Sequence, residues 1–462
     1  MTVNTKHQSL KDAEEDLSLV DALWGGTRKM REAGTLYLPK ATAEETSDWQ
    51  ARRDRSVLTN FFKKTIKVMA GRLFEDTVTV KDTTPAFIDF AENVDLEGRN
   101  LHRFAYDLTQ KCVRDGLRFI VIDAPAATGV KTAAEERMAG IRPYFVEVDI
   151  RNVLGWKTAD IGGNRVITQF RYTENVTEPT DEFSSITVEQ IRVIEPGMVS
   201  LYRKDKKNEW QLYDEIPTST DFAPVVPIYS GRQGFFEAEP PLMDLAWLNV
   251  AHWQSDSDQR NILHYTRAPI LHWAGGGAQY DESGKAVEVA VGPGSLARST
   301  DASARLEYVE PQGAAIGHGR QDLIDLESRA IALGADFATP RKSGDMTATE
   351  AAIGESGDVS DLSAMAQNIK DSLKVAFDMV GRMTKKPFTG GVTLNTDLGI
   401  AYNGVNVPEL VKLRSLGDLS REGLFEVLNG MWDLEIDADK ESERLEFEGG
   451  SPQQVDEFGG QL

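Results

Sequence analysis

Short β-rich runs fill residues 142–236, and helical segments flank them on both sides. The runs read RPYFVEVD, RVITQFRYTE, TVEQIRVIE, MVSLYRK and EWQLYDEI, with turn residues such as Pro196-Gly197 between them. Consecutive short strands joined by tight turns pair with their neighbours in antiparallel fashion. The sequence therefore predicts an antiparallel β region inserted into a helical scaffold, and the expected fold class is α+β.

Apolar residues at three- and four-residue spacings predict helices on either side of this insertion. In the third helix, for example, Leu101, Phe104, Leu108 and Cys112 share one face, and the run LRFIVID after it predicts a buried strand. Paired prolines after Glu239 suit the start of a long helix. The expected helices cover residues 8–33, 43–73, 101–114, 240–265, 319–337 and 347–386, the last with a kink near Gly354 and Gly357.

Composition excludes several classes of function. The chain has 462 residues with 51 basic and 73 acidic side chains, a formal charge of −22. A protein that grips nucleic acid tightly usually presents a basic patch, and no long Lys/Arg run occurs here. The single cysteine, Cys112, makes neither an internal disulfide nor a thiolate zinc site. No apolar run approaches the roughly 18 residues of a membrane span, and the N-terminus lacks the apolar core of a signal peptide.

Catalytic motifs are missing or broken. ATGVKT at 127–132 lacks the glycine spacing of a phosphate-binding P-loop, and GESGD at 354–358 misses the last glycine of a nucleophile elbow. The six histidines are scattered, and no pair has metal-ligand spacing on one helix. We therefore expect no enzyme activity, no catalytic or metal-binding residues and no cofactor.

Three segments carry a resemblance to a known family. They are ETSDWQARRDRSVLTNFFKKTIKVMAGRLF at 45–74, EPPLMDLAWLNVAHWQSDSDQRNIL at 239–263, and the run from LIDLESRAIALGADF to QNIKDSL at 323–373. In this order, with the β insertion between the first two, they resemble portal proteins of tailed bacteriophages, the head–tail connectors. The resemblance extends from about Gly34 to Glu448.

The resemblance implies a division of the chain into the parts of a portal subunit. By position these are a wing at 1–238, a first stem helix at 239–266, a clip at 267–315, a second stem helix at 316–337, a tunnel loop at 338–346, a kinked wing helix at 347–387, a small crown at 388–448 and a disordered tail at 449–462. Portals of this family form rings, most often dodecamers, at one capsid vertex.

The implied role is a channel for packaging and ejecting double-stranded DNA without sequence specificity, and a nucleator of procapsid assembly. The implied partners are further copies of the chain, the large terminase subunit, a neck or adaptor protein, and the major capsid and scaffold proteins. The expected location is the virion, with the host cytoplasm during assembly and no membrane. The alternatives are another phage structural protein, such as a minor head protein, and an assembly hydrolase or nuclease.

The resemblance also assigns candidate site residues. For docking of the motor and neck, the clip offers Gly275, Gly276, Gly277, Tyr280, Gly292 and Gly294. The tunnel loop offers Arg341, Lys342, Ser343, Gly344 and Asp345. Its two adjacent cations either touch passing phosphates or pair with carboxylates of neighbouring subunits. The helix stripe Leu326, Ala330, Leu333 and Phe337 is expected to pack within the subunit or between subunits.

Overall fold

The computed structural model describes residues 2–125, 142–266, 270–274, 305–309, 314–334 and 348–396, with single positions up to 444. The chain divides into two compact units. Residues 1–342 and 368–393 form the first unit, and residues 343–367 and 394–462 form the second. Within the second unit the described residues include the first part of a long helix, in which Leu362, Met365 and Ala366 are buried.

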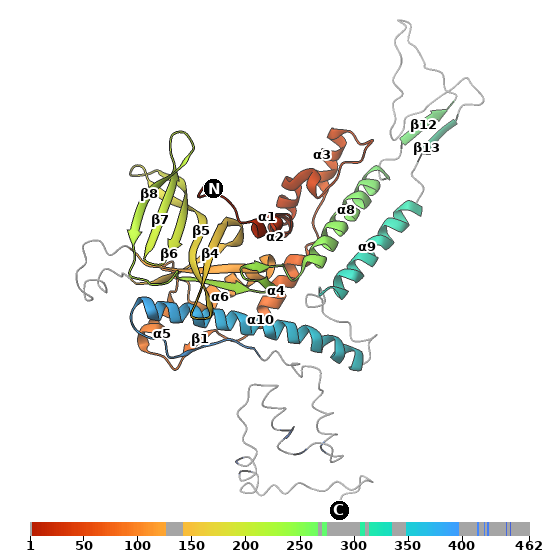
Figure 1. The fold of residues 1–462 in the computed structure, drawn as a ribbon. Coiled ribbons are helices and arrows are strands. Elements are labelled where there is room, and N and C mark those ends of the chain that lie inside the picture. The colour runs from red at the N-terminus through yellow and green to blue at the C-terminus, as the bar shows by residue number, and fades with distance from the viewer. Residues whose placement is uncertain are drawn as a thin grey trace, which may run out of the picture. The chain divides into compact units, whose positions relative to one another are not determined.

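Helices and antiparallel strands both contribute to the first unit, which confirms the α+β class (Figure 1). The N-terminal elements are α1 (Gln8–Asp12), α2 (Glu14–Ala33), α3 (Thr46–Arg55), α4 (Phe61–Leu73), β1 (Thr79–Lys81), α5 (Pro85–Glu92) and α6 (Leu101–Asp115). The strands that follow are β2 (Leu117–Asp123), β3 (Tyr144–Asp149), β4 (Val153–Ile161), β5 (Asn164–Pro179), β6 (Ser185–Glu195), β7 (Met198–Lys204), β8 (Trp210–Pro217), β9 (Val225–Tyr229), β10 (Arg232–Gly234) and β11 (Glu237–Ala238). The remaining elements are α8 (Met243–Thr266), β12 (Ile270–Ala274), β13 (Arg305–Val309), α9 (Ala314–Ala332), α10 (Ala348–Met383) and β14 (Gly391–Thr393).

Two of the expected helices are each divided. The prediction of a single helix at 43–73 is wrong. The backbone becomes extended at Ser56, and a second helix, α4, begins after Asn60. The Asn60 side chain accepts a hydrogen bond from the Lys63 N–H, which satisfies a donor that the first turn leaves free. The helix expected at 8–33 likewise appears as α1 and α2, joined at Ala13.

The β insertion forms a meander in the order β4-β5-β6-β7-β8, with every neighbouring pair antiparallel. Its flanking strands β3 and β9 belong to a second sheet, in the order β3-β2-β9. The insertion is therefore not self-contained, because β2 lies before it in the chain and pairs with both of its ends.

Apolar side chains from both sheets and the N-terminal helices form the main core. Phe119 of β2, Phe170 of β5 and Phe236 pack against one another with ring centroids 4.9–6.1 Å apart, and all three are buried. A second aromatic group joins α5, β3 and the end of α10, where Phe377 lies 5.5 Å from Phe90 and 5.7 Å from Phe145. These contacts hold the last turns of α10 against the smaller sheet.

A buried group of charged side chains lies where α6 runs into β2. The carboxylate of Asp115 is fully buried and lies 2.6 Å from Arg114 and 2.5 Å from Arg118. Asp149 at the end of β3 lies 3.0 Å from Arg118 and 2.6 Å from Arg151. Opposite charges at these distances compensate one another's loss of hydration. The group therefore fixes the start of β2 to the end of β3.

Strand β14 pairs with β1 in register, with Val392 opposite Val80. This places Gly391–Thr393, which lies within the range expected for a crown, in the first unit. Most of the remaining range 397–448 lies outside the described residues, as do residues 449–462. The kink expected in α10 and the limits of the other parts remain predictions.

Candidate subunit-contact site on the α8–α9 helix pair

Helices α8 and α9 form an antiparallel pair in the region expected to be the stem (Figure 1). Ser255 donates a hydrogen bond to Asp322 at 2.5 Å, and Gln259 donates one to the Ile316 carbonyl oxygen at 3.0 Å. Gly319 allows this approach, because a Cβ atom there would meet Gln259 Oε1 at 2.1 Å. A side chain at this position would force the Gln259 amide to move away from its hydrogen bond with Ile316.

The buried side of α8 is tied to α4 by one asparagine. Asn249 is fully buried; its Oδ1 accepts from the Phe62 N–H at 3.2 Å, and its Nδ2 donates to the Thr59 carbonyl oxygen at 2.8 Å. Trp253, one turn further along, is also fully buried. Asn249 thus satisfies two backbone groups at the start of α4 and ties α8 to that helix.

Charged and hydroxyl groups join α8 to α3. Arg52 lies 2.8 Å from Glu44 and 3.1 Å from Asp258, and it also donates to the Pro39 carbonyl oxygen. Ser56 donates to Ser257 at 2.8 Å. The hydrogen bond from Arg52 lowers the pKa of the Glu44 carboxyl below its ordinary value, even though burial alone would raise it.

Apolar side chains occupy two opposite sides of α9. Leu326 and Ala330 are buried, and Ala330 packs with Leu245 of α8. Ile324 and Ile331 are seven residues apart and therefore share a face, which is about 140–160° round the helix from Leu326. Their exposed fractions are 44% and 42%. This side of α9 therefore carries apolar surface that the single chain does not cover.

An open groove of ≈ 390 Å³ runs along the pair. Its lining residues are Ala251, Gln254, Ser255, Asp258, Gln259, Ile262, Gly319, Asp322 and Leu326. Two carboxylates face it, and Asp258 is engaged by Arg52. In addition, Trp247 and Tyr265 of α8 are 44% and 52% exposed. Helix α8 therefore presents aromatic side chains to solvent as well as the polar side chains of the groove.

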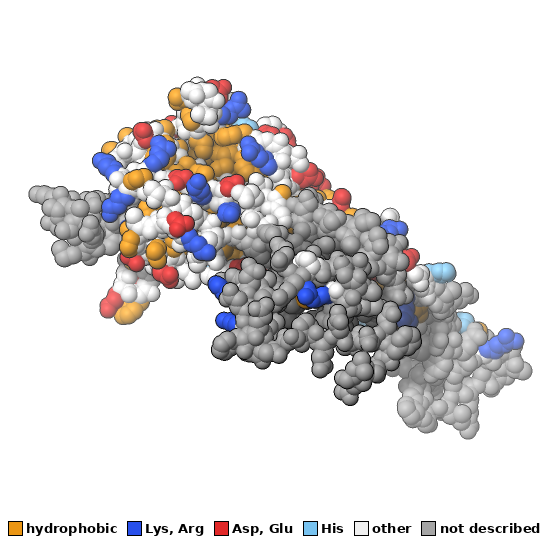
Figure 2. All heavy atoms as spheres, turned by 90° about the horizontal axis from the view of Figure 1, so that it is seen from below, with side chains coloured by type: hydrophobic (Ala, Val, Ile, Leu, Met, Phe, Trp, Pro, Cys, Tyr) orange, Lys and Arg blue, Asp and Glu red, His pale blue; other side chains and the backbone are white. Residues whose placement is uncertain are grey.

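Two observations on the described residues concern metal-type clusters and the cysteine thiol. Across them, no group of three or more His, Cys, Asp or Glu side chains is arranged to hold a metal ion. The Cys112 thiol is fully buried, and burial raises its pKa to about 12, so it is a poor nucleophile. On the face seen in Figure 2, basic and acidic side chains are interspersed over the part that is described.

The expected packing residues differ in their environments. Leu326 and Ala330 are buried, whereas Leu333 is 41% exposed in the single chain. Phe337, the clip residues and the tunnel-loop residues lie outside the described residues. Neither Asn249 nor the exposed pair Ile324 and Ile331 was predicted from the sequence. The seven-residue spacing of the two isoleucines is a signal that could have found that pair.

Comparisons with known proteins give a partial family match. Residues 241–383, which include α8, α9 and α10, match the model of a domain of unknown function, DUF4055. No curated protein matches the chain. No helix among the residues that the structure describes is both long and apolar enough to cross a membrane.

Two solved structures contain chains similar to this one. The first is "Neck of empty GTA particle computed with C6 symmetry", with 9% identity, a TM-score of 0.43, and coverage of 83% of this chain and 93% of that chain. The second is "Virion of native gene transfer agent (GTA) particle", with 10% identity, a TM-score of 0.41, and coverage of 92% of this chain and 99% of that chain.

Proposed function

We propose that the chain is a portal-type subunit that assembles into a ring at one vertex of a phage capsid. The observation that carries the proposal is the second apolar side of α9, at Ile324 and Ile331, which the chain itself leaves exposed. A neighbouring copy that covers this side removes the apolar surface from water, which favours association. The order of the three resembling segments along the chain supports the same assignment.

Charge is consistent with a channel through which DNA slides. Twelve copies would carry 12 × −22 = −264 formal charges. A strongly acidic ring repels the phosphate backbone, so passing DNA does not adhere to its wall. In this proposal the ring admits and retains the genome, nucleates the procapsid, and docks the terminase and neck proteins through residues 267–315.

Electron microscopy and native mass spectrometry of the purified full chain test the proposal. The expected result is closed rings with a central hole, and no ATP hydrolysis by the chain alone, because a separate terminase supplies the energy. A chain that stays monomeric at high protein concentration, or one that hydrolyses ATP or cuts DNA, would overturn the proposal.

Paired variants make the test specific to α9. Ile324→Asp with Ile331→Asp places charges on the face proposed to be covered, so rings should be lost while the monomer keeps its fold. Ile324→Leu with Ile331→Leu keeps that face apolar and should preserve the rings. Circular dichroism of both variants separates lost association from lost folding.

A further inference from the structure

The turn between β5 and β6 presents an aromatic side chain to solvent. Phe183 is 90% exposed at this turn, which we call the hairpin tip and define as residues 180–184. Asp181 accepts hydrogen bonds from the backbone N–H groups of Phe183 and Ser184, each at 2.9 Å, and from the Ser184 hydroxyl. The tip is therefore held in one conformation before any contact forms, which lowers the entropy cost of binding.

The hairpin tip is acidic as well as aromatic. Asp181 is engaged in the turn, whereas the exposed Glu182 makes no hydrogen bond or ion pair with any residue that the structure describes. The exposed Ile186 follows at the start of β6. The tip thus offers one apolar ring beside one free carboxylate.

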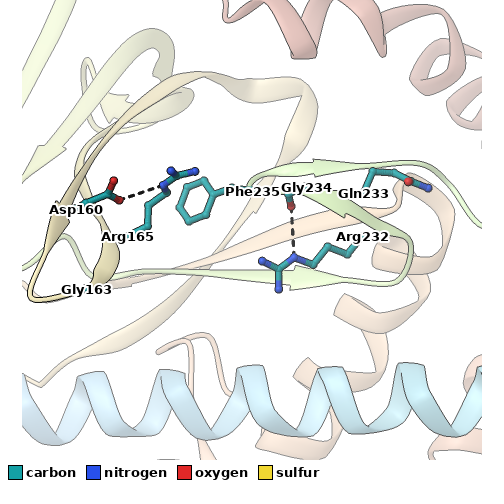
Figure 3. Close-up of a pocket in the computed structure, with 7 residues that line it drawn as sticks. All are labelled: Asp160, Gly163, Arg165, Arg232, Gln233, Gly234 and Phe235. Atoms are coloured by element: carbon teal, nitrogen blue, oxygen red, sulfur yellow. Dashed lines mark hydrogen bonds and ion pairs between the residues drawn. The ribbon is translucent and has the colours of Figure 1, made fainter.

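A hollow of complementary character lies at the other end of β5 (Figure 3). We call it the arginine hollow. It is an open depression of ≈ 760 Å³ between the β4–β5 turn and the β10–β11 turn, lined by Asp160, Gly163, Arg165, Arg232, Gln233, Gly234 and Phe235. The half-buried ring of Phe235 lies beside the Arg165 side chain (Figure 3) and stacks on Phe236 with ring centroids 4.4 Å apart.

The two arginines of the hollow differ in their hydrogen-bond and ion-pair partners. Arg165 lies 3.3 Å from Asp160, which compensates its charge. Arg232 is exposed and donates only through Nε to the Gly234 carbonyl oxygen at 3.4 Å, while it stacks on Tyr229 at 5.0 Å. Its terminal nitrogens make no hydrogen bond or ion pair within the described part of the chain. Arg232 is therefore the donor group that a carboxylate would recognise.

The tip and the hollow of one chain cannot meet. They lie at opposite ends of β5, and its 16 residues span about 50 Å at roughly 3.3 Å per residue. The antiparallel meander on both sides keeps this strand extended. A contact between the two sites thus requires two copies of the chain. Such a contact joins unlike surfaces, and repeated contacts of this kind close into a ring or continue as a filament.

We propose that the hairpin tip of one copy inserts into the arginine hollow of the next, with Phe183 against Phe235 and Glu182 paired with Arg232. This contact rests on the proposed ring and adds to it a second subunit contact, in the β region and distinct from the one on α9. The occupant is a second copy of this chain, because the acidic aromatic tip and the basic aromatic hollow are complementary in charge and in apolar character.

Site-specific crosslinking tests the contact in the full chain. Ile186→Cys with Gln233→Cys puts one thiol beside each site and leaves Glu182, Phe183, Phe235 and both arginines in place. The native Cys112 is buried and stays unreactive, so a short bis-maleimide joins only the introduced thiols. The expected product is a ladder of multimers on denaturing gels, whereas each single variant should give no ladder.

Charge exchange supplies an independent readout. Glu182→Arg and Arg232→Glu should each weaken association at least tenfold, and the two together should restore most of it. Wild-type rings without crosslinked multimers and without charge rescue would overturn this contact and leave the proposed ring standing. Crosslinked open filaments would support the contact and count against the closed ring. A wild-type chain that never associates would overturn both.

Discussion

Asn249 of α8 accepts a hydrogen bond from the backbone N–H of Phe62 in the first turn of α4, at a distance of 3.2 Å. The same side chain donates to the Thr59 carbonyl oxygen, so a single buried amide satisfies two backbone groups at the start of another helix. The position of the α8–α9 pair relative to α4 therefore depends on this residue.

Replacing Asn249 by leucine should destabilise the chain strongly. Leucine has a similar volume but leaves the Phe62 N–H and the Thr59 carbonyl oxygen without partners in a buried site. We expect a loss of about 2–4 kcal/mol in the free energy of unfolding. Urea unfolding followed by circular dichroism measures it, and a change below about 0.5 kcal/mol would show that these hydrogen bonds do not hold α8.

Replacing Leu326 by aspartate should abolish soluble rings. Leu326 is buried and lines the same groove as Asp258 and Asp322, so the new carboxylate would be desolvated near two other carboxylates and cost several kcal/mol. Unlike the charged pair at Ile324 and Ile331, this change should also lower the melting temperature of the monomer. Native mass spectrometry that finds normal rings of the Leu326→Asp variant would contradict the packing described for α9.

Two glycine-to-alanine changes should act in opposite directions. Gly116 has φ +83°, and a Cβ atom there would lie 2.8 Å from the Glu239 carbonyl group, so Gly116→Ala should destabilise the chain by about 2–3 kcal/mol. Gly71 is helical with open space around it, and Gly71→Ala should stabilise the chain by up to about 1 kcal/mol. Urea unfolding midpoints compare the two, and equal shifts would refute the close approach at Gly116.

Acid should weaken the fold through Asp149. Burial alone would raise the pKa of this carboxyl, but the hydrogen bond from Arg151 and the charges of Arg118 and Arg151 outweigh burial and hold the pKa below its ordinary value. A lowered folded-state pKa stabilises the fold above the unfolded pKa of about 4, and this stabilisation is lost as the pH falls below it.

The variant Asp149→Asn has no carboxyl to titrate at this position. Its free energy of unfolding should be lower than that of the wild type at pH 7 and should fall less steeply between pH 5 and pH 3. Unfolding curves at several pH values measure both slopes. Parallel slopes for the two proteins would mean that Asp149 does not contribute to the acid sensitivity.

The tunnel loop proposed from sequence has a test with two readouts. If Arg341 and Lys342 contact passing DNA, changing both to alanine should leave ring melting unchanged and alter the length or retention of packaged DNA. If they pair with neighbouring subunits, ring melting should fall even without DNA. A lower melting temperature together with full-length packaging would reject the DNA contact.

Local patterns predicted the elements whose packing is local. The spacing of Leu101, Phe104, Leu108 and Cys112 predicted α6, and the run LRFIVID predicted β2. Both predictions were possible because a buried helix face or a buried strand requires apolar residues at regular positions in the sequence. The break between α3 and α4 was not predicted, because the amphipathic pattern continues from one helix into the next and hides the break between Ser56 and Asn60. The start of α4 is set by the capping side chain of Asn60.

Contacts between distant segments could not be predicted from spacing. Nothing near β2 indicates that β9 is its partner, since the pairing depends on how the insertion returns to the scaffold. In the candidate site, the stripe containing Leu326 and Ala330 was found because it repeats along one helix. The role of Asn249 depends on the first turn of α4, so its neighbouring residues in the sequence carry no signal for it.

The pairing of β2 with both β3 and β9 has a consequence for synthesis on the ribosome. About 100 residues separate β2 from β9, and at roughly 5–20 residues per second their translation takes about 5–20 s. During this interval the side of β2 that will bind β9 is an unpaired edge, rich in the apolar residues of LRFIVID. The nascent chain is therefore most vulnerable to aggregation before the ribosome reaches Tyr229, and a pause within the insertion would lengthen that exposure.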